Sequence, residues 1–118
     1  MARILVADDD AEQVNLQRMV LEALGHTVET ALSAPATLER LARSTPHLIV
    51  IDLRFPTAGD GMALIRGIRR TGYSRPVIVL SGWPDDLYGT PEEKMVSRIV
   101  VKGSVRELLD AIAGLLAG

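Results

Sequence analysis

The sequence contains no cysteine, which excludes disulfide bonds, thiolate metal sites and cysteine nucleophiles. Aromatic residues make up only 3% of the chain, so a hydrophobic core must consist mainly of aliphatic side chains and methionine. No apolar run approaches the roughly 20 residues of a membrane-spanning helix, and the N-terminus lacks the pattern of a signal peptide. The formal net charge of -2 gives no electrostatic reason to expect nucleic-acid binding. We therefore expect a cytoplasmic protein that binds neither membranes nor nucleic acid.

The chain has 118 residues, which is the size of one ordinary domain, and 47% of them are hydrophobic. Short apolar segments alternate with segments in which apolar residues recur at helical spacing. This alternation predicts one domain over residues 1–118, of the α/β class, in which a doubly wound, five-stranded parallel sheet carries helices on both faces. The predicted strands span residues 4–7, 27–31, 48–51, 77–80 and 99–101, and the predicted helices span residues 11–24, a stretch from Ser33 to at least Ala42, residues 60–70, and a stretch from Ser104 to Leu116.

The order of the strands and one irregular connection can also be predicted. The segment 27–31 mixes polar and apolar residues, as a half-exposed edge strand does, and this gives the order 2-1-3-4-5. A further helix would be expected between the last two strands, but Pro84, Gly89 and Pro91 interrupt that segment. We therefore predict that this fourth helix is short or irregular, with at most a short helical stretch near residues 92–96.

Four of the five apolar runs end in a polar or charged side chain. These side chains are Asp8 and Asp9, Asp52, Ser81, and Lys102. Ligands of an open α/β sheet bind beyond the carboxyl ends of its strands, so we expect all of these residues to lie at one pocket. The order 2-1-3-4-5 makes the first and third strands neighbours, which brings Asp9 close to Asp52.

The residue types at this pocket point to phosphoryl transfer. Clustered carboxylates raise one another's pKa unless a cation neutralises them, and ligation by oxygen atoms alone suits Mg²⁺, or Mn²⁺, rather than Zn²⁺. A metal bound to Asp52 also screens the charge of an incoming phosphoryl group. Ser81 can donate a hydrogen bond to one phosphoryl oxygen, and Lys102, one of only two lysines among thirteen basic residues, can pair with another. We therefore predict that Asp52 accepts a phosphoryl group.

With these residues the chain resembles the receiver domain of two-component response regulators, including stand-alone ones similar to the chemotaxis regulator. The resemblance covers essentially all 118 residues and implies a flavodoxin-like receiver fold. It implies that Asp52 is the phosphoacceptor, Ser81 the switch hydroxyl and Lys102 the phosphate-pairing lysine. It also implies that the protein catalyses only its own phosphorylation and dephosphorylation. The resemblance rests on Ile4-Leu5-Val6-Ala7-Asp8-Asp9-Asp10, on Leu48-Ile49-Val50-Ile51-Asp52 followed by Pro56 and Asp60-Gly61, on Leu80-Ser81-Gly82, and on Val100-Val101-Lys102.

The same resemblance implies a metal site and partners. Asp9 and Asp52 would ligate Mg²⁺ directly, Asp8 would do so through water, and the backbone carbonyl of Arg54 would complete the protein ligands. The phosphoryl group would come from a histidine kinase, a phosphotransfer protein or a small phosphodonor. The signal would pass to a downstream protein or to a fused output domain, and the receiver would be a monomer or a weak homodimer.

Several positions depart from the family pattern. Lys102 is followed by Gly103 where the family has a proline after a cis bond, and we expect a trans bond because a cis bond without proline costs about 3 kcal/mol. Ile99 stands where the family has an aromatic switch residue, and the loop 56–61 is one residue longer than the commonest form. The segment 83–98 is poor in helix formers. We therefore predict the usual phosphorylation chemistry with an unusual route to the output.

Arg54 and Trp83 occupy the two variable positions that flank the predicted site. We hypothesise that Trp83 shields the phosphoryl group from water, or that Arg54 pairs with it, so that the phosphorylated state is long-lived. Each residue also has a plainer interpretation. Asp8 to Asp10 can cap the first helix, Ser81 can belong to a turn, and Trp83 can be a packed surface aromatic.

Two other functions compete with the signalling switch. The first is a phosphorylation-independent interaction module that kept the pocket and lost the switch, which Ile99, Gly103 and the interrupted segment 84–91 support. The second is a metal-dependent hydrolase with Asp52 as nucleophile, which lacks an evident general acid and a substrate cap. Titration with Mg²⁺ and a phosphoryl mimic separates these three functions.

Overall fold

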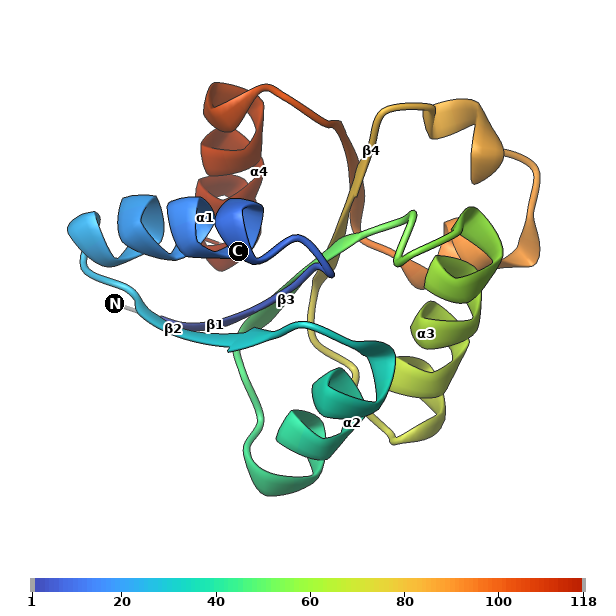
Figure 1. Ribbon diagram of the computed structural model, residues 1–118, viewed down its shortest axis with the longest axis horizontal. Helices are drawn as coiled ribbons and strands as arrows, with labels where there is room; N and C mark the ends of the chain where they lie inside the picture. The colour runs from blue at the N-terminus through green and yellow to red at the C-terminus, as the bar shows by residue number, and fades with distance from the viewer. Residues whose placement is uncertain (1, 118) are drawn as a thin grey trace.

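The computed structural model describes residues 2–117 and contains one sheet of five parallel strands (Figure 1). The strands lie in the order β2-β1-β3-β4-β5, which confirms the order predicted from the sequence. β2 is half-buried along most of its length whereas β3 and β4 are buried throughout, so its polar residues did mark the edge of the sheet. The strands are β1 (Arg3–Ala7), β2 (Thr27–Ala31), β3 (Leu48–Asp52), β4 (Val77–Ser81) and β5 (Arg98–Val101).

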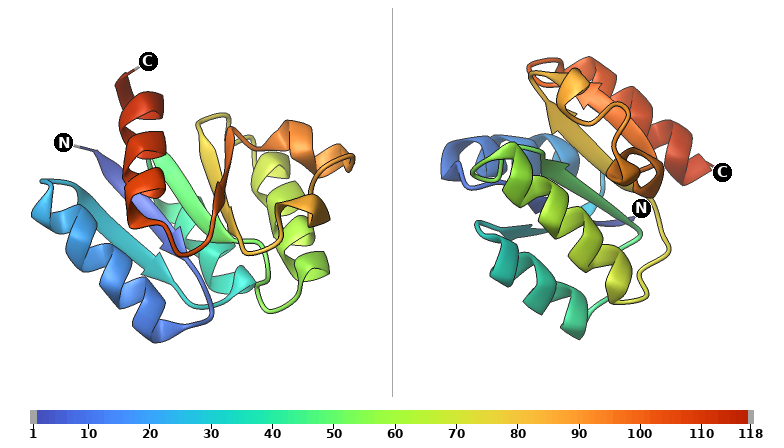
Figure 2. Two further views of the ribbon diagram at one scale, coloured as in Figure 1. Left: turned by 90° about the horizontal axis from the view of Figure 1, so that it is seen from above. Right: turned by 90° about the vertical axis from the view of Figure 1, so that its right-hand side faces the viewer.

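Within residues 2–117, four α-helices cover the two faces of the sheet (Figure 1 and Figure 2). Val14 of α1 and Leu108 of α4 pack into one apolar cluster, and Leu64 and Ile68 of α3 pack into the other. The sheet is therefore doubly wound, as predicted. None of these helices is long and apolar enough to cross a membrane. The helices are α1 (Ala11–Ala23), α2 (Ala34–Arg43), α3 (Ala58–Arg70) and α4 (Val105–Ala117).

Hydroxyl side chains begin three of the helices. The Ser33 hydroxyl accepts a hydrogen bond from the backbone N–H three residues further on, at 3.1 Å, and Ser104 does the same at 3.2 Å. Thr57 caps α3 in a reciprocal pair with Asp60, because each accepts from the other's backbone N–H. α3 therefore begins at Ala58, two residues earlier than the apolar spacing predicted.

The segment between β4 and β5 forms two short 3₁₀-helices, η1 (Pro84–Asp86) and η2 (Pro91–Met95), in place of a regular α-helix. This confirms the prediction of a short or irregular fourth helix. The segment is nevertheless anchored beside α3, as Figure 2 shows. Leu87 is fully buried, and the largely buried Glu92 forms an ion pair with Arg66 of α3 at 3.5 Å. The irregular segment is therefore anchored to the rest of the protein at two points, Leu87 just after η1 and Glu92 in η2.

Candidate phosphoryl-acceptor site

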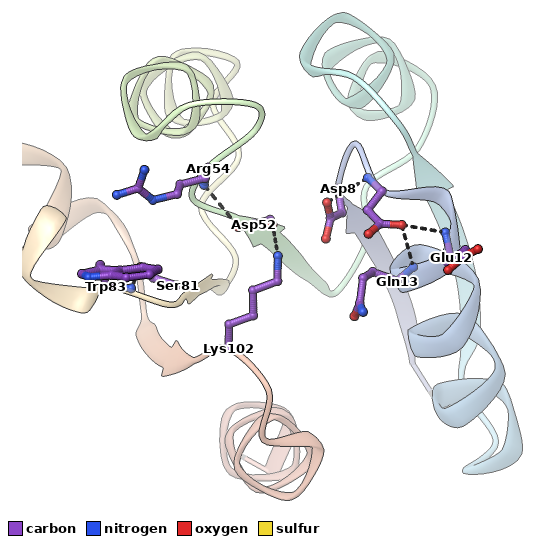
Figure 3. Close-up of polar contacts among 9 residues, drawn as sticks. Asp8, Glu12, Gln13, Asp52, Arg54, Ser81, Trp83 and Lys102 are labelled. Atoms are coloured by element: carbon purple, nitrogen blue, oxygen red, sulfur yellow. Dashed lines mark hydrogen bonds and ion pairs between the residues drawn. The ribbon is translucent and has the colours of Figure 1, made fainter.

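Asp52 is the last residue of β3 and is only 5% exposed. Its Oδ2 accepts a hydrogen bond from Lys102 Nζ at 2.5 Å, and its Oδ1 accepts one from the Arg54 backbone N–H at 3.2 Å (Figure 3). A buried carboxylate at the end of an apolar strand is costly unless such donors compensate for its lost hydration. The same donors suit the oxygens of a phosphoryl group.

Asp8 comes directly after β1, the strand next to β3 in the sheet, and is 2% exposed. Its Oδ1 accepts a hydrogen bond from the Asp10 backbone N–H at 3.0 Å, whereas its Oδ2 is buried without a hydrogen-bond partner. Burial, together with the charge of Asp52, raises the pKa of Asp8 to about 6, although the hydrogen bond from the Asp10 N–H opposes the rise. An unpartnered carboxylate oxygen beside a second carboxylate fits a site for a divalent cation that prefers oxygen ligands.

Lys102 follows β5, and its side chain extends to the Asp52 carboxylate (Figure 3). Its backbone N–H donates to the Ser81 carbonyl at 2.9 Å, which joins the ends of β4 and β5. Burial alone would lower the pKa of Lys102, but the hydrogen bond and charge of Asp52, together with the charge of Asp8, raise it. Lys102 is therefore positively charged at neutral pH.

Among residues 2–117 the cis peptide bond is the one between Phe55 and Pro56. The bond between Lys102 and Gly103 is therefore trans. Gly103 has a φ of +103°, which only glycine adopts readily, and this permits the turn from β5 into α4. The expectation of a trans bond at this position is thus confirmed.

Ser81 is the last residue of β4 and is 1% exposed. Its hydroxyl oxygen accepts a hydrogen bond from the Trp83 backbone N–H at 3.0 Å, so Ser81 does take part in a turn, as its plainer interpretation predicted. The hydroxyl proton is still available to a phosphoryl oxygen, since a serine hydroxyl both donates and accepts. The turn and the predicted role of Ser81 are therefore compatible.

Asp9 and Asp10 differ from Asp8 because both are exposed. Asp10 caps α1 by accepting from the backbone N–H groups of Glu12 and Gln13, so the capping interpretation holds for this residue. Asp9 lines a 510 Å³ cleft between α2 and α3. In the part of the chain that the structure describes, no three acidic or histidine side chains group closely enough to hold a metal ion. Metal ligation by Asp9 and by the Arg54 carbonyl stays a prediction.

Asp86 is a neighbour of the site that the sequence did not single out. Its Oδ2 accepts from Arg54 Nη2 at 2.8 Å, and the Arg54 guanidinium lies over the Trp83 ring, 5.4 Å from its centroid. Asp86 lies 32 residues beyond Arg54 in the chain, on η1, so no local pattern connects the two. Arg54, Trp83 and Asp86 are called the arginine cluster below.

Removing the charge of Lys102 tests the electrostatic balance of the site. In Lys102→Ala we expect the free energy of unfolding at neutral pH, without divalent cations, to fall by about 1 kcal/mol, because Asp52 loses its charged partner. The loss stays modest since 38% of the Lys102 side chain is exposed to solvent. Urea denaturation measures the change, and exposed Lys94, the only other lysine, provides the matched control Lys94→Ala. Equal effects of the two variants would show that Lys102 does not stabilise Asp52.

Comparison with known proteins agrees with this geometry. Residues 4–113 match the family model of the response regulator receiver domain. Response regulator MprA of Mycobacterium ulcerans is 38% identical over 79 residues, which cover 67% of this chain and 34% of MprA. The chain thus spans about a third of the length of this curated relative.

Solved structures show the same fold. NtrX from Brucella abortus, crystallised in complex with ATP, superimposes with a TM-score of 0.84 at 25% identity, over 98% of this chain and 27% of NtrX. TrrA from Thermotoga maritima, crystallised in complex with Mg²⁺-BeF, superimposes with a TM-score of 0.85 at 23% identity, over 98% of this chain and 99% of TrrA.

Proposed function

Because the chain belongs to the response regulator receiver family of two-component signalling, we propose that it accepts a phosphoryl group on Asp52 and thereby changes a partner-binding surface. One observation carries the proposal: Asp52 is buried at a strand end with Lys102 Nζ on one carboxylate oxygen and the Arg54 N–H on the other. Ser81 lies at the end of the neighbouring strand. The site therefore offers a nucleophile and donors for the oxygens of a transferred phosphoryl group.

We propose Mg²⁺ as the cofactor, with Mn²⁺ as a substitute. The buried, unpartnered Oδ2 of Asp8 supports this, as does the all-oxygen character of the ligands. Asp8, Asp9, Asp52 and the Arg54 carbonyl would hold the ion, Asp8 through water. When bound, Mg²⁺ supplies positive charge that neutralises the carboxylates and screens the incoming phosphoryl group.

The chain's own residues would perform the transfer. A carboxylate oxygen of Asp52 attacks the phosphorus atom of a phosphohistidine, a new P–O bond forms, and the P–N bond to the imidazole breaks. Lys102 then moves from the Asp52 oxygen to a phosphoryl oxygen, and the Ser81 hydroxyl donates a hydrogen bond to another. These contacts exist only in the phosphorylated state, so they favour one of two conformations by differential binding.

The proposed partners follow from the family, whose receiver domains interact with histidine kinases and output domains. On the donor side we propose a histidine kinase or a phosphotransfer protein. On the output side we propose a downstream protein or a fused output domain, and we assign the receiver no external substrate beyond its phosphodonor. Residues 1–118 would act as one receiver domain, as a monomer or a weak homodimer.

A titration with a phosphoryl mimic tests the proposal. Trp83 is the only tryptophan and lies beside the site, so its fluorescence reports on changes there. We expect saturable Mg²⁺ binding, then a further change with beryllofluoride, and loss of that second change in Asp52→Asn. Asp10→Asn is the control, because asparagine also caps a helix and Asp10 lies outside the proposed ligand set.

The other outcomes distinguish the alternatives. Mg²⁺ binding with no response to beryllofluoride, and no phosphorylation by a small phosphodonor, would favour the phosphorylation-independent module. Turnover of a generic phosphoester that disappears in Asp52→Asn would favour the hydrolase. Neither outcome is compatible with a phosphorylation-controlled switch.

A further inference from the structure

The arginine cluster connects the acceptor site to the irregular segment after β4. The Arg54 backbone N–H contacts Asp52, whereas its side chain points away from Asp52 and lies over the Trp83 ring (Figure 3). The guanidinium forms an ion pair with Asp86, with 2.8 Å between Arg54 Nη2 and Asp86 Oδ2. One residue therefore contacts the acceptor with its backbone and η1 with its side chain.

η1 is also connected to the site from the other direction. The Asp86 backbone N–H donates to the Trp83 carbonyl at 3.0 Å, and the Trp83 N–H donates to the Ser81 hydroxyl at 3.0 Å. The residues from Asp52 through Arg54, Asp86 and Trp83 to Ser81 thus form a continuous chain of contacts between the ends of β3 and β4. η1 is therefore in contact with the carboxyl ends of both β3 and β4 through these residues.

The ion pair is well placed for exchange because it is partly solvated. The side chain of Arg54 is 52% exposed and that of Asp86 is 30% exposed, and ion pairs with such exposure contribute little to stability. A phosphoryl group on Asp52 carries nearly two negative charges and can accept two parallel N–H bonds from a guanidinium. The phosphoryl group therefore competes well with Asp86 for Arg54.

We propose that Asp86 is a positioning residue that holds the Arg54 guanidinium away from Asp52, and that phosphorylation transfers this guanidinium from Asp86 to the phosphoryl oxygens. The inference rests on the proposed function of Asp52. Release of Asp86 frees η1 from the loop after β3 and removes the cation from the Trp83 ring. The exchange gives the chain a route from acceptor to surface that needs no aromatic side chain at Ile99, which is half-buried against the α2–α3 side of the core.

Asp86→Asn tests the exchange, because asparagine keeps the size of the side chain and removes its charge. In Mg²⁺, we expect beryllofluoride to bind Asp86→Asn about two- to fivefold more tightly than wild type, since Arg54 no longer has to leave an anionic partner. Without beryllofluoride, the Trp83 emission of Asp86→Asn should shift toward that of the mimic-bound wild type. Asp86→Glu should restore the wild-type emission and affinity.

The matched control is Asp85→Asn, which removes the same charge from the exposed neighbouring position on η1 and should match wild type. In an Arg54→Gln background, Asp86→Asn should change the affinity no further, because the group through which it acts is gone. Equal affinities of wild type and Asp86→Asn would overturn the inference and leave the proposed function intact. Failure of the wild type itself to bind beryllofluoride would overturn both.

Discussion

Replacing Gly61 by alanine is expected to destabilise the protein by roughly 3 kcal/mol or more. Gly61 lies in the first turn of α3, where this turn packs against the backbone just after Asp52. A Cβ atom at Gly61 would overlap the backbone carbonyl of Leu53, far inside the distance at which non-bonded atoms can pack. The Leu53 backbone cannot shift easily, since Leu53 is fully buried and its N–H donates to the Leu80 carbonyl at 2.9 Å. Either α3 or the acceptor loop must move.

Urea denaturation followed by circular dichroism measures the loss. Gly59→Ala is the matched control in the same helix, because its Cβ atom would meet only the Thr57 hydroxyl at 3.8 Å, an ordinary contact. That variant should be neutral or more stable by up to about 1 kcal/mol, since alanine favours helix over glycine. If both variants unfold at the same urea concentration, the close packing of α3 on Leu53 does not exist.

The Gly61 contact also has a functional consequence. Leu53 separates Asp52 from Arg54, whose backbone N–H donates to the Asp52 carboxylate. A displaced Leu53 carbonyl would shift that donor, so the folded fraction of Gly61→Ala should bind beryllofluoride more weakly than Gly59→Ala does. Gly61 is therefore needed both for the packing of α3 and for the position of the N–H that donates to Asp52.

Much of this fold followed from the sequence because its signals are local. A mixed pattern at residues 27–31 marked the edge strand, and unbroken apolar runs marked the inner strands. Since parallel strands end at the same edge of a sheet, the strand-end residues Asp8, Asp52 and Lys102 could be placed together before any side chain was seen. The hydrogen bond between Asp52 and Lys102 shows that these two side chains do lie together, and their roles in phosphoryl transfer stay predictions.

The parts that could not be predicted depend on loop conformation or on distant contacts. Asp9 follows Asp8 directly, yet it is exposed, because the direction of a side chain beyond a strand end is set by the loop and not by the strand. Asp86 meets Arg54 only through the folding of η1. The need for glycine at Gly61 arises from the approach of α3 to Leu53, which no sequence pattern records.

Asp8→Asn is expected to stabilise the metal-free protein by roughly 1–3 kcal/mol above about pH 6. Burial, first of all, and the charge of Asp52 raise the pKa of Asp8 from 3.8 to about 6. The folded state therefore binds this proton more tightly than the unfolded state does. The resulting stability is fully present below pH 4 and is lost as the pH rises through the folded pKa. Asparagine has no charge to lose and keeps an oxygen that can accept from the Asp10 N–H.

Urea denaturation in a chelator, at pH 5 and pH 8, tests the sign of this effect. The stability of wild type relative to Asp8→Asn should be lower at pH 8 than at pH 5, and the exposed control Asp85→Asn, whose charge is not among those that shift the pKa of Asp8, should follow wild type at both pH values. Adding Mg²⁺ at pH 8 should reverse the ranking, because the ion binds the ionised carboxylate of wild type and stabilises the state that it binds. A metal-free Asp8→Asn protein that is less stable than wild type at pH 8 would mean that the ionised Asp8 carboxylate is compensated without a metal. The burial of Asp8 would then carry no argument for a cation.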